Sequence, residues 1–362
     1  MSSSPISTTP LPLRILTSLL SHTLTNAYLQ IPLLLTLLSS RSPSLKNRLP
    51  SRLTKLLSSP LFQRLLKILI FINLNRTLSR VVVNNWRGDN GEGEEEEIVV
   101  ITGASSGIGR VMAREFVRRG GCRVVNLDVK KPEMESETKI TYYQTDITST
   151  TELALRGSQI RSQFGPPTVL INNAGIGHSG SILSVPETQL HQIFNVNTIA
   201  HFLTVREFLP GMIERGRGHV VTIASMASYV TVPGMVDYCC TKASAVAFHE
   251  GLAQELKVLD GGRGRGIRTT LVNPTWIETP LIEGLTKEKR FRERAFVLRP
   301  EDVAEAVVNQ VRMGRSGHLV LPRWYGLVSG IRAWPAWLQE ALRNRVGREA
   351  AMLMGEGVGL GA

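Results

Sequence analysis

The sequence predicts an α/β domain with a doubly wound parallel sheet of about seven strands. Three observations support this. Short apolar runs rich in β-branched residues alternate with stretches of helical periodicity, a glycine-rich turn joins the first run to its helix, and no long internal repeat is present. The 362 residues are 42% hydrophobic, which suits one large α/β domain with extensions.

The predicted elements follow one another along the chain. Strands are expected at 99–101, 122–128, 139–144, 168–172, 219–224, 267–272 and 318–321. Helices are expected at 111–119, 150–164, 187–209, 235–259 and 300–312. Because helices separate most successive strands, the strands are expected to be parallel and covered on both faces, as in a Rossmann-type sheet.

A glycine-rich turn, TGASSGIG at 102–109, follows the first strand. Its spacing is neither GxGxxG nor that of a phosphate-binding loop ending in Lys-Ser/Thr. In a strand–turn–helix unit, glycines let the backbone approach a pyrophosphate, and the free N–H groups of the helix start point at it. The residues expected to bind such a cofactor are Gly103, Ser105, Ser106, Gly107, Ile108 and Gly109.

An acidic residue, Asp128, lies 25 residues after Gly103 at the end of the second strand. A carboxylate at this position accepts hydrogen bonds from the adenosine ribose and repels a 2′-phosphate, which favours NAD over NADP. Lys130 and Lys131 follow closely and leave NADP as the alternative. Asp146 and Ile147, after the third strand, are expected to bound the adenine pocket.

Tyr238 and Lys242 are four positions apart in a predicted helix, so both side chains project from one face. A nearby ammonium is expected to lower the pKa of the phenol, which otherwise titrates near 10. Ser225 follows the fifth strand, where its hydroxyl is expected to hold a substrate oxygen beside Tyr238. The amide and small residues 172–175 end the fourth strand at the edge where ligands bind.

Together these motifs resemble the short-chain dehydrogenase/reductase family over residues 97–325. The resemblance implies that Tyr238 is the general acid/base, that Lys242 binds the cofactor ribose and tunes Tyr238, and that Ser225 orients the reacting oxygen. It also implies a proton-relay water on Asn197, with Asn195 as the alternative. Further cofactor contacts are implied at Asn173, Ala174, Gly175, Val196, Tyr238, Lys242, Pro274 and Thr279.

One position departs from the family pattern, because Pro274 is followed by Thr275 where the family usually has glycine.

Within the family, the runs 194–210 and 238–249 resemble membrane-associated retinol and 17β-hydroxysteroid dehydrogenases. This implies a lipophilic alcohol or ketone substrate, the endoplasmic reticulum or a lipid droplet as location, and a homodimer formed through the two long helices. The alternatives are an NADP-linked ketone or ketoacyl reductase and a non-catalytic nucleotide-binding scaffold on a membrane or droplet.

The excess of basic residues is confined to the N-terminal segment. Residues 1–88 hold 11 Lys or Arg and no acid, whereas the remainder holds 31 basic and 30 acidic residues. An uncharged run at 15–40 and an apolar run at 61–74, which carries Arg64 and Lys67, predict a membrane anchor. A mitochondrial transit peptide is the alternative, because such peptides are also rich in Arg and Ser and poor in acids.

The expected organisation is a membrane-associated segment at 1–83, an acidic linker at 84–97, the Rossmann domain at 98–325 and an amphipathic extension with a tail at 326–362. Tryptophans and arginines between 324 and 346 predict either contact with a membrane interface or packing on the substrate pocket. Three cysteines and seven histidines show no disulfide or metal-ligand spacing, so no metal is expected. Because the basic residues flank apolar runs, nucleic acid is not an expected partner.

Overall fold

The computed structural model describes residues 59–86, 96–132, 138–287 and 295–354, and the single residues Lys55, Lys289 and Phe291. The chain divides into two compact units, residues 1–88 and 89–362. The predicted uncharged run at 15–40 and most of the acidic linker lie outside the described residues.

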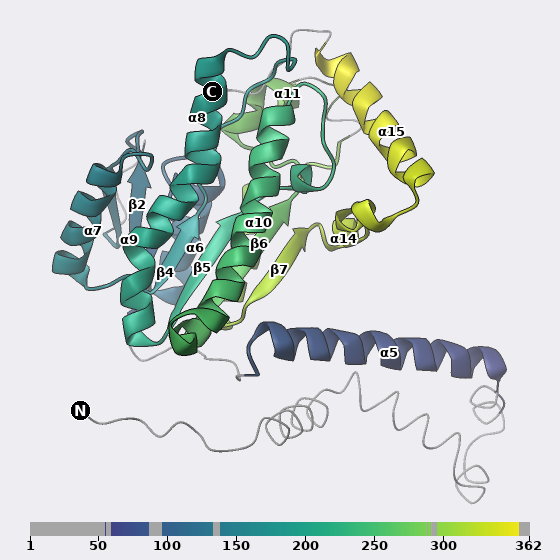
Figure 1. Ribbon diagram of the computed structural model, residues 1–362, viewed down its shortest axis with the longest axis horizontal. Coiled ribbons are helices and arrows are strands. Elements are labelled where there is room, and N and C mark those ends of the chain that lie inside the picture. The colour runs from purple at the N-terminus through teal and green to yellow at the C-terminus, as the bar shows by residue number, and fades with distance from the viewer. Residues whose placement is uncertain are drawn as a thin grey trace, which may run out of the picture. The chain divides into compact units, whose positions relative to one another are not determined.

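The second unit is built on a seven-stranded parallel sheet with strand order β3-β2-β1-β4-β5-β6-β7 (Figure 1). The strands are β1 Ile98–Thr102, β2 Arg123–Asp128, β3 Ile140–Gln144, β4 Val169–Asn172, β5 Gly218–Ile223, β6 Ile267–Pro274 and β7 Gly317–Leu321. This confirms the predicted Rossmann-type sheet. The strand order reverses beside β1, between β1 and β4, and in open α/β sheets ligands bind at such a switch point.

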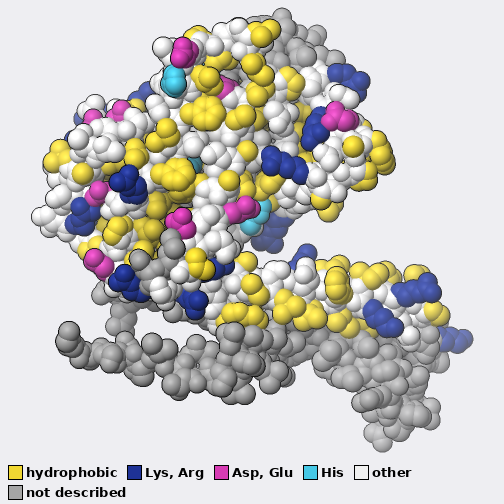
Figure 2. All heavy atoms as spheres, viewed as in Figure 1, with side chains coloured by type: hydrophobic (Ala, Val, Ile, Leu, Met, Phe, Trp, Pro, Cys, Tyr) yellow, Lys and Arg dark blue, Asp and Glu magenta, His cyan; other side chains and the backbone are white. Residues whose placement is uncertain are grey.

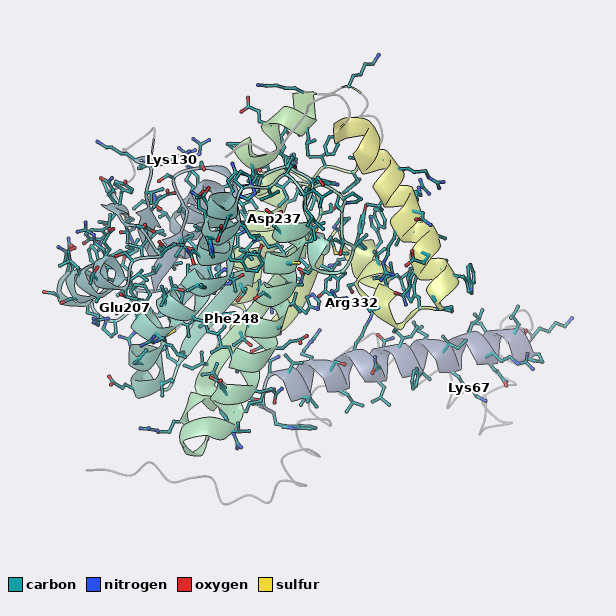
Figure 3. The ribbon with its side chains drawn as sticks, turned by 45° about the horizontal axis from the view of Figure 1, so that its top comes forward. Lys67, Lys130, Glu207, Asp237, Phe248 and Arg332 are labelled. Carbon is teal, nitrogen blue, oxygen red and sulfur yellow. The ribbon has the colours of Figure 1, made fainter. Side chains whose placement is uncertain are left out.

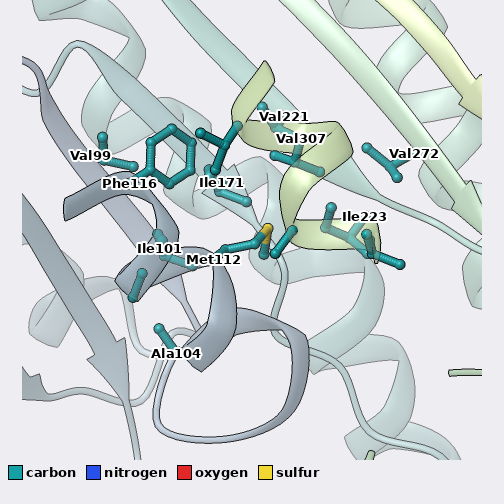
Figure 4. Close-up of a cluster of buried hydrophobic side chains, with 14 of the residues drawn as sticks. Val99, Ile101, Ala104, Met112, Phe116, Ile171, Val221, Ile223, Val272 and Val307 are labelled. Carbon is teal, nitrogen blue, oxygen red and sulfur yellow. The ribbon is translucent and has the colours of Figure 1, made fainter. Parts of the chain in front are cut away.

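Helices cover both faces of the sheet. α6 Gly107–Gly120 and α13 Pro300–Arg312 pack on one face, and α7 Thr150–Phe164, α9 Ala200–Arg215 and α10 Val236–Val258 pack on the other. Side chains alternate along β1, so Val99 and Ile101 face α6 whereas Val100 faces α9 and α10. Figure 4 shows Met112 and Phe116 of α6 packed against this first face.

The predicted helix at 187–209 is three segments in the structure. α8 Glu187–Phe194 is followed by the π-helix η1 Asn195–Ile199 and then by α9, which continues to Arg215 through Pro210. Phe208 and Met212 are buried on either side of this proline, and their packing holds the helix together where the sequence suggested an end. The π-turn adds a residue and turns Asn197 into the protein interior, where it is fully buried.

The loop after β6 and the C-terminal extension contain short helices. η4 Pro280–Ile282 and α11 Glu283–Lys287 follow β6, and the extension comprises η5 Arg323–Tyr325, α14 Gly326–Ser329, η6 Ile331–Ala333 and α15 Ala336–Met354. η2 Met226–Ser228 follows β5, and η3 Leu259–Gly266 follows α10.

The first unit contains α5 Pro60–Val83, which extends the predicted apolar run at 61–74 in both directions. Most of its apolar side chains are exposed, and Figure 2 shows them interspersed with Lys and Arg along the helix. Within the described part of the chain, no helix combines the length and apolar character needed to cross a bilayer.

Candidate active site

In the glycine-rich turn between β1 and α6, Gly103 and Gly109 lie where a side chain would collide with the backbone. Gly103 and Gly107 have φ angles of +70° and +52°, a region that glycine adopts without strain. A Cβ on Gly103 would lie 2.8 Å from the Cα of Ala174, and one on Gly109 would collide with the carbonyl oxygen of Gly103. Ser106, at the start of α6, makes no side-chain capping bond, so the helix N–H groups are left for an anion.

Two buried polar side chains hold this turn in place. Asn126 of β2 accepts a hydrogen bond from the N–H of Ala104 at 3.0 Å and donates one to the hydroxyl of Ser105 at 3.0 Å. The Thr102 hydroxyl accepts hydrogen bonds from the N–H groups of Asn173 and Ala174, both at 3.0 Å. The turn is therefore joined to both strands that flank β1.

The acidic residues predicted for the adenosine side differ in environment. Asp128 accepts hydrogen bonds from the N–H groups of Ser105 and Lys130, each at 3.0 Å, which fixes its carboxylate beside the turn. Asp146 is exposed and accepts both the N–H and the hydroxyl of Thr148, so its side chain closes the local turn before α7. Ile147 is buried in the core.

The end of β4 lies between the turn and the predicted catalytic residues. The side-chain amide of Asn173 donates to the carbonyl oxygens of Thr102 and Gly103 at 3.0 Å each. A Cβ on Gly175 would lie 3.4 Å from both Asn197 Oδ1 and Lys242 Nζ. Gly175 thus borders the space that the amide and the ammonium share.

α10 brings Tyr238 and Lys242 together with Ser225, which follows β5. The Lys242 ammonium lies 5.7 Å from the centre of the Tyr238 ring and donates a hydrogen bond to the carbonyl oxygen of Ile223 at 3.0 Å. A side-chain hydrogen bond joins Tyr238 to Ser225, whose hydroxyl also accepts the N–H of Ala227 at 3.1 Å.

Burial controls the protonation of this group. It raises the pKa of Tyr238 to about 12, although the hydrogen bond from Ser225 opposes the increase. It lowers the pKa of Lys242 to about 8, because a buried ammonium loses its hydration. In the protein alone, desolvation of the phenolate outweighs the expected lowering of the Tyr238 pKa by Lys242, so the net shift is upward.

The side chain of Asn197 mainly fixes the backbone after β4 to α10. Its amide accepts the N–H of Ile176 at 2.9 Å, and donates to the carbonyl of Ile176 at 2.8 Å and to the hydroxyl of Thr241 at 3.2 Å. Both amide protons are engaged, so a relay water on this side chain has only the remaining lone pair of Oδ1. The neighbouring Val196 is half-buried and Asn195 is exposed.

A cavity of about 560 Å³ extends from the turn to the C-terminal extension. Its lining includes the site residues Ser225, Tyr238, Lys242 and Asn173, together with Ile108, Pro274 and Thr279, and Arg345 and Glu349 of α15 line it as well. The remaining wall is largely apolar and includes Met226, Val230, Trp276, Leu281, Phe291, Phe296, Trp324, Leu342 and Val346. Leu342 and Val346 belong to α15, so α15 packs on the cavity. Packing on the substrate pocket was one of the two expected alternatives for this segment.

These residues fit a nicotinamide dinucleotide. The glycines let the turn pack closely against β4 and lead into α6, whose first N–H groups suit a pyrophosphate, and Asp128 lies at the end of the next strand. The short chain dehydrogenase family model matches residues 97–290. The chain belongs to the short-chain dehydrogenase family.

Similar members of the family include dehydrogenases with different names. Dehydrogenase RED2 of Cochliobolus heterostrophus is 42% identical over 201 residues, which are 55% of this chain and 75% of that protein. Estradiol 17-beta-dehydrogenase 11 of Macaca fascicularis is 32% identical, covering 59% of this chain and 71% of that protein. Retinol dehydrogenase 10-B of Danio rerio is 33% identical, covering 57% and 69%.

Among solved structures, the 3-ketoacyl-(acyl-carrier-protein) reductase from Brucella melitensis complexed with NADH is similar to this chain. The TM-score is 0.56 and the identity 29%, over 63% of this chain and 97% of that one.

Some residues of this short-chain dehydrogenase site were not predicted from the sequence. Asn126 is the one polar residue between apolar neighbours in a buried strand, and that isolation was the available signal. The packing of Trp276 and Phe291 beside the cavity comes from the loop after β6, whose conformation the sequence pattern did not indicate.

Proposed function

We propose that the chain is an NAD-preferring dehydrogenase of a lipophilic alcohol, or a reductase of the corresponding ketone. The observation that carries the proposal is that one cavity is lined by Tyr238 and Ser225 and otherwise mostly by apolar side chains. A substrate with one hydroxyl or carbonyl on a hydrophobic skeleton suits such a wall. Retinol and estradiol, which appear in the names of two relatives, are alcohols of this kind.

In the proposed mechanism, Ser225 and Tyr238 hold the reacting oxygen by hydrogen bonds. Tyr238 keeps its proton at neutral pH, because burial raises its pKa to about 12, and it is therefore ready to protonate a developing alkoxide. In the oxidative direction Tyr238 first releases its proton to solvent, and the resulting phenolate, which the positive charge of Lys242 stabilises, then accepts the hydroxyl proton of the alcohol. A bound nicotinamide supplies the hydride acceptor or donor. Asn197 holds the backbone of Ile176 and the hydroxyl of Thr241, which precedes Lys242, in place.

The preference for NAD rests on Asp128. Its carboxylate is fixed by two backbone N–H groups at the end of β2, and it would repel the 2′-phosphate of NADP. Lys130 is exposed next to it, and an NADP-linked ketone reductase remains the second candidate on that observation.

The test is an assay of the full chain with NAD and NADP against retinoids, hydroxysteroids and long-chain alcohols. We expect turnover with NAD and at least one of these substrate classes, and a much lower rate for Tyr238→Phe. Normal NAD binding without oxidation of any of them would favour the nucleotide-binding scaffold instead.

We also propose that the enzyme works at a membrane or lipid-droplet surface of the endoplasmic reticulum. Trp324, Leu327 and Trp337 are 59%, 77% and 72% exposed, and Figure 2 shows hydrophobic and basic side chains together over α14 and α15. Aromatic and basic residues together suit a lipid interface. Replacing Leu327 and Trp337 by serine is expected to reduce turnover of vesicle-dissolved substrate, whereas Leu155→Ser, an exposed leucine on α7, is the matched control.

A homodimer is proposed through the helices on the α9 and α10 face of the sheet. Leu190, Ile199 and Phe202 are exposed apolar side chains there, and Phe202 makes an edge contact with Phe248 of α10. Light scattering of the purified chain is expected to give twice the mass of 39.9 kDa, and a Phe202→Glu variant is expected to give the monomer mass.

A further inference from the structure

A histidine and an aspartate form a pair directly behind the candidate active site. The Nδ1 atom of His178 lies 2.9 Å from Oδ2 of Asp237, and the two side chains are only 13% and 7% exposed. Neither ring nitrogen of His178 has a well-aligned hydrogen-bond partner among the described residues. Neither side chain lines the cavity, so neither is assigned a contact with substrate or cofactor.

The pair joins two segments that carry different parts of the site. His178 belongs to the segment 173–184 after β4, in which Asn173, Gly175 and Ser179 line the cavity. Asp237 belongs to the first turn of α10, and its Oδ1 atom accepts the N–H of Tyr238 at 2.8 Å. Asp237 is labelled in Figure 3 near the start of this helix.

Backbone contacts support the same junction on either side of the pair. The N–H of Gly180 donates to the carbonyl oxygen of Gly234 at 2.9 Å, just before α10. On the other side, Asn197 binds both backbone polar groups of Ile176. Between these two anchors, His178 and Asp237 provide the side-chain link.

We propose that His178 and Asp237 are positioning residues, which fix the first turn of α10, and with it the Tyr238 phenol, against the 173–184 segment that borders the reacting atoms. This inference rests on the proposed role of Tyr238. When one partner of such a buried polar pair is removed, the other stays buried without its partner, which destabilises the junction. Misplacement of a catalytic group by about 1 Å lowers turnover on the order of 100-fold.

The experiment compares Asp237→Asn, His178→Phe and the double variant with the wild-type full chain. We expect each single variant to lower kcat by about 10- to 100-fold, with KM and the NADH dissociation constant changed by less than about twofold. The kcat of the double variant is expected to be no lower than that of the less active single variant, because the two residues act as one unit. His178→Gln keeps an N–H donor and is expected to recover most of the lost kcat.

The matched control is His191→Phe. His191 pairs with Glu187 at 3.4 Å, but these side chains are 72% and 87% exposed, so kcat is expected to stay at the wild-type value. A readout that does not depend on activity is amide hydrogen exchange over residues 237–242, which is expected to become faster in Asp237→Asn and to stay unchanged in His191→Phe.

The possible results separate this inference from the proposed function. If Tyr238→Phe turns over normally, the proposed function fails and the inference fails with it. If Tyr238→Phe is inactive while Asp237→Asn and His178→Phe keep normal kcat and normal amide exchange, only the positioning role is overturned. Equal losses of kcat in the pair variants and in His191→Phe would also overturn it.

Discussion

Lys242 is a buried cation, and its replacement by methionine tests how burial controls the site. Folding lowers the pKa of this ammonium from 10.5 to about 8, because the buried charge loses its hydration. This difference corresponds to about 3 kcal/mol by which folding disfavours the charged form. Methionine has similar length and no charge, so Lys242→Met removes this cost together with the hydrogen bond to the carbonyl of Ile223.

The sign of the pH dependence follows from the protons bound in each state. Between pH 8 and about 10.5 the unfolded lysine keeps its proton while the folded one has released it, so the unfolded state binds more protons. The free energy of unfolding of the wild type therefore rises with pH in this window. Lys242→Met lacks the titrating group, and its stability advantage over the wild type is expected to shrink by about 2 to 3 kcal/mol between pH 7 and pH 10.

The assay is urea unfolding of both proteins at pH 7, 8, 9 and 10, followed by circular dichroism. The loss of the hydrogen bond to Ile223 changes the free energy of unfolding of the variant by the same amount at each pH. The change of the difference with pH therefore reports on the ammonium alone. Val246→Met, on the same helix, changes no titrating group, and its difference from the wild type is expected to stay constant. Parallel pH dependences for Lys242→Met and the wild type would refute the reasoning.

Three further predictions concern the cofactor site and the core. Gly109→Ala introduces a Cβ that collides with the carbonyl of Gly103, and it is expected to weaken NADH binding by tenfold or more, from an overpacking cost of about 1 to 3 kcal/mol, measured by calorimetry. Asp128→Ser removes the carboxylate beside the turn and is expected to shift the ratio of NADP to NAD affinity by at least about tenfold towards NADP, measured by fluorescence titration. Phe116→Ala empties a site that is 1% exposed and is expected to lower the free energy of unfolding by about 3 to 5 kcal/mol in denaturant titrations. An unchanged value would contradict, in turn, the cofactor role of the glycine-rich turn, the NAD preference set by Asp128 and the contribution of Phe116 to the core.

Much of the fold was predictable because local signals agree with the tertiary structure. α7 begins at Thr150 and ends at Phe164 as predicted, since Ser149 caps its N-terminus and Gly165 follows its last turn. The buried strands are short apolar runs between helices, which is the pattern of a parallel sheet. The seven strands were therefore predicted from these short apolar runs and their alternation with helices.

The differences arise where tertiary packing overrides the local pattern. The helix was expected to end at residue 209, but α9 continues through Pro210 to Arg215, with Phe208 and Met212 buried. The π-turn around Asn197 adds one residue to a helix, and hydrophobic periodicity does not reveal such an addition.

Within the candidate site, the sequence indicated which residues gather but not how they interact. The i, i+4 spacing of Tyr238 and Lys242 implied a cation next to the phenol, whereas the pKa of the phenol is set mainly by its burial, which spacing does not reveal. Likewise, His178 and Asp237 are 59 residues apart in the chain and meet because α10 begins near the segment that follows the end of β4.

The central claim is that Tyr238 exchanges the hydroxyl proton while hydride leaves a lipophilic alcohol for the nicotinamide. Its most direct test is isotope transfer from an alcohol deuterated at the carbinol carbon, presented in vesicles with NAD and the full chain, with the reduced cofactor analysed by mass spectrometry. The account predicts deuterated NADH with the wild-type chain and a rate at least about 100-fold lower with Tyr238→Phe, which is the contribution expected of a general acid/base. Deuterium transfer at the wild-type rate by Tyr238→Phe would contradict it.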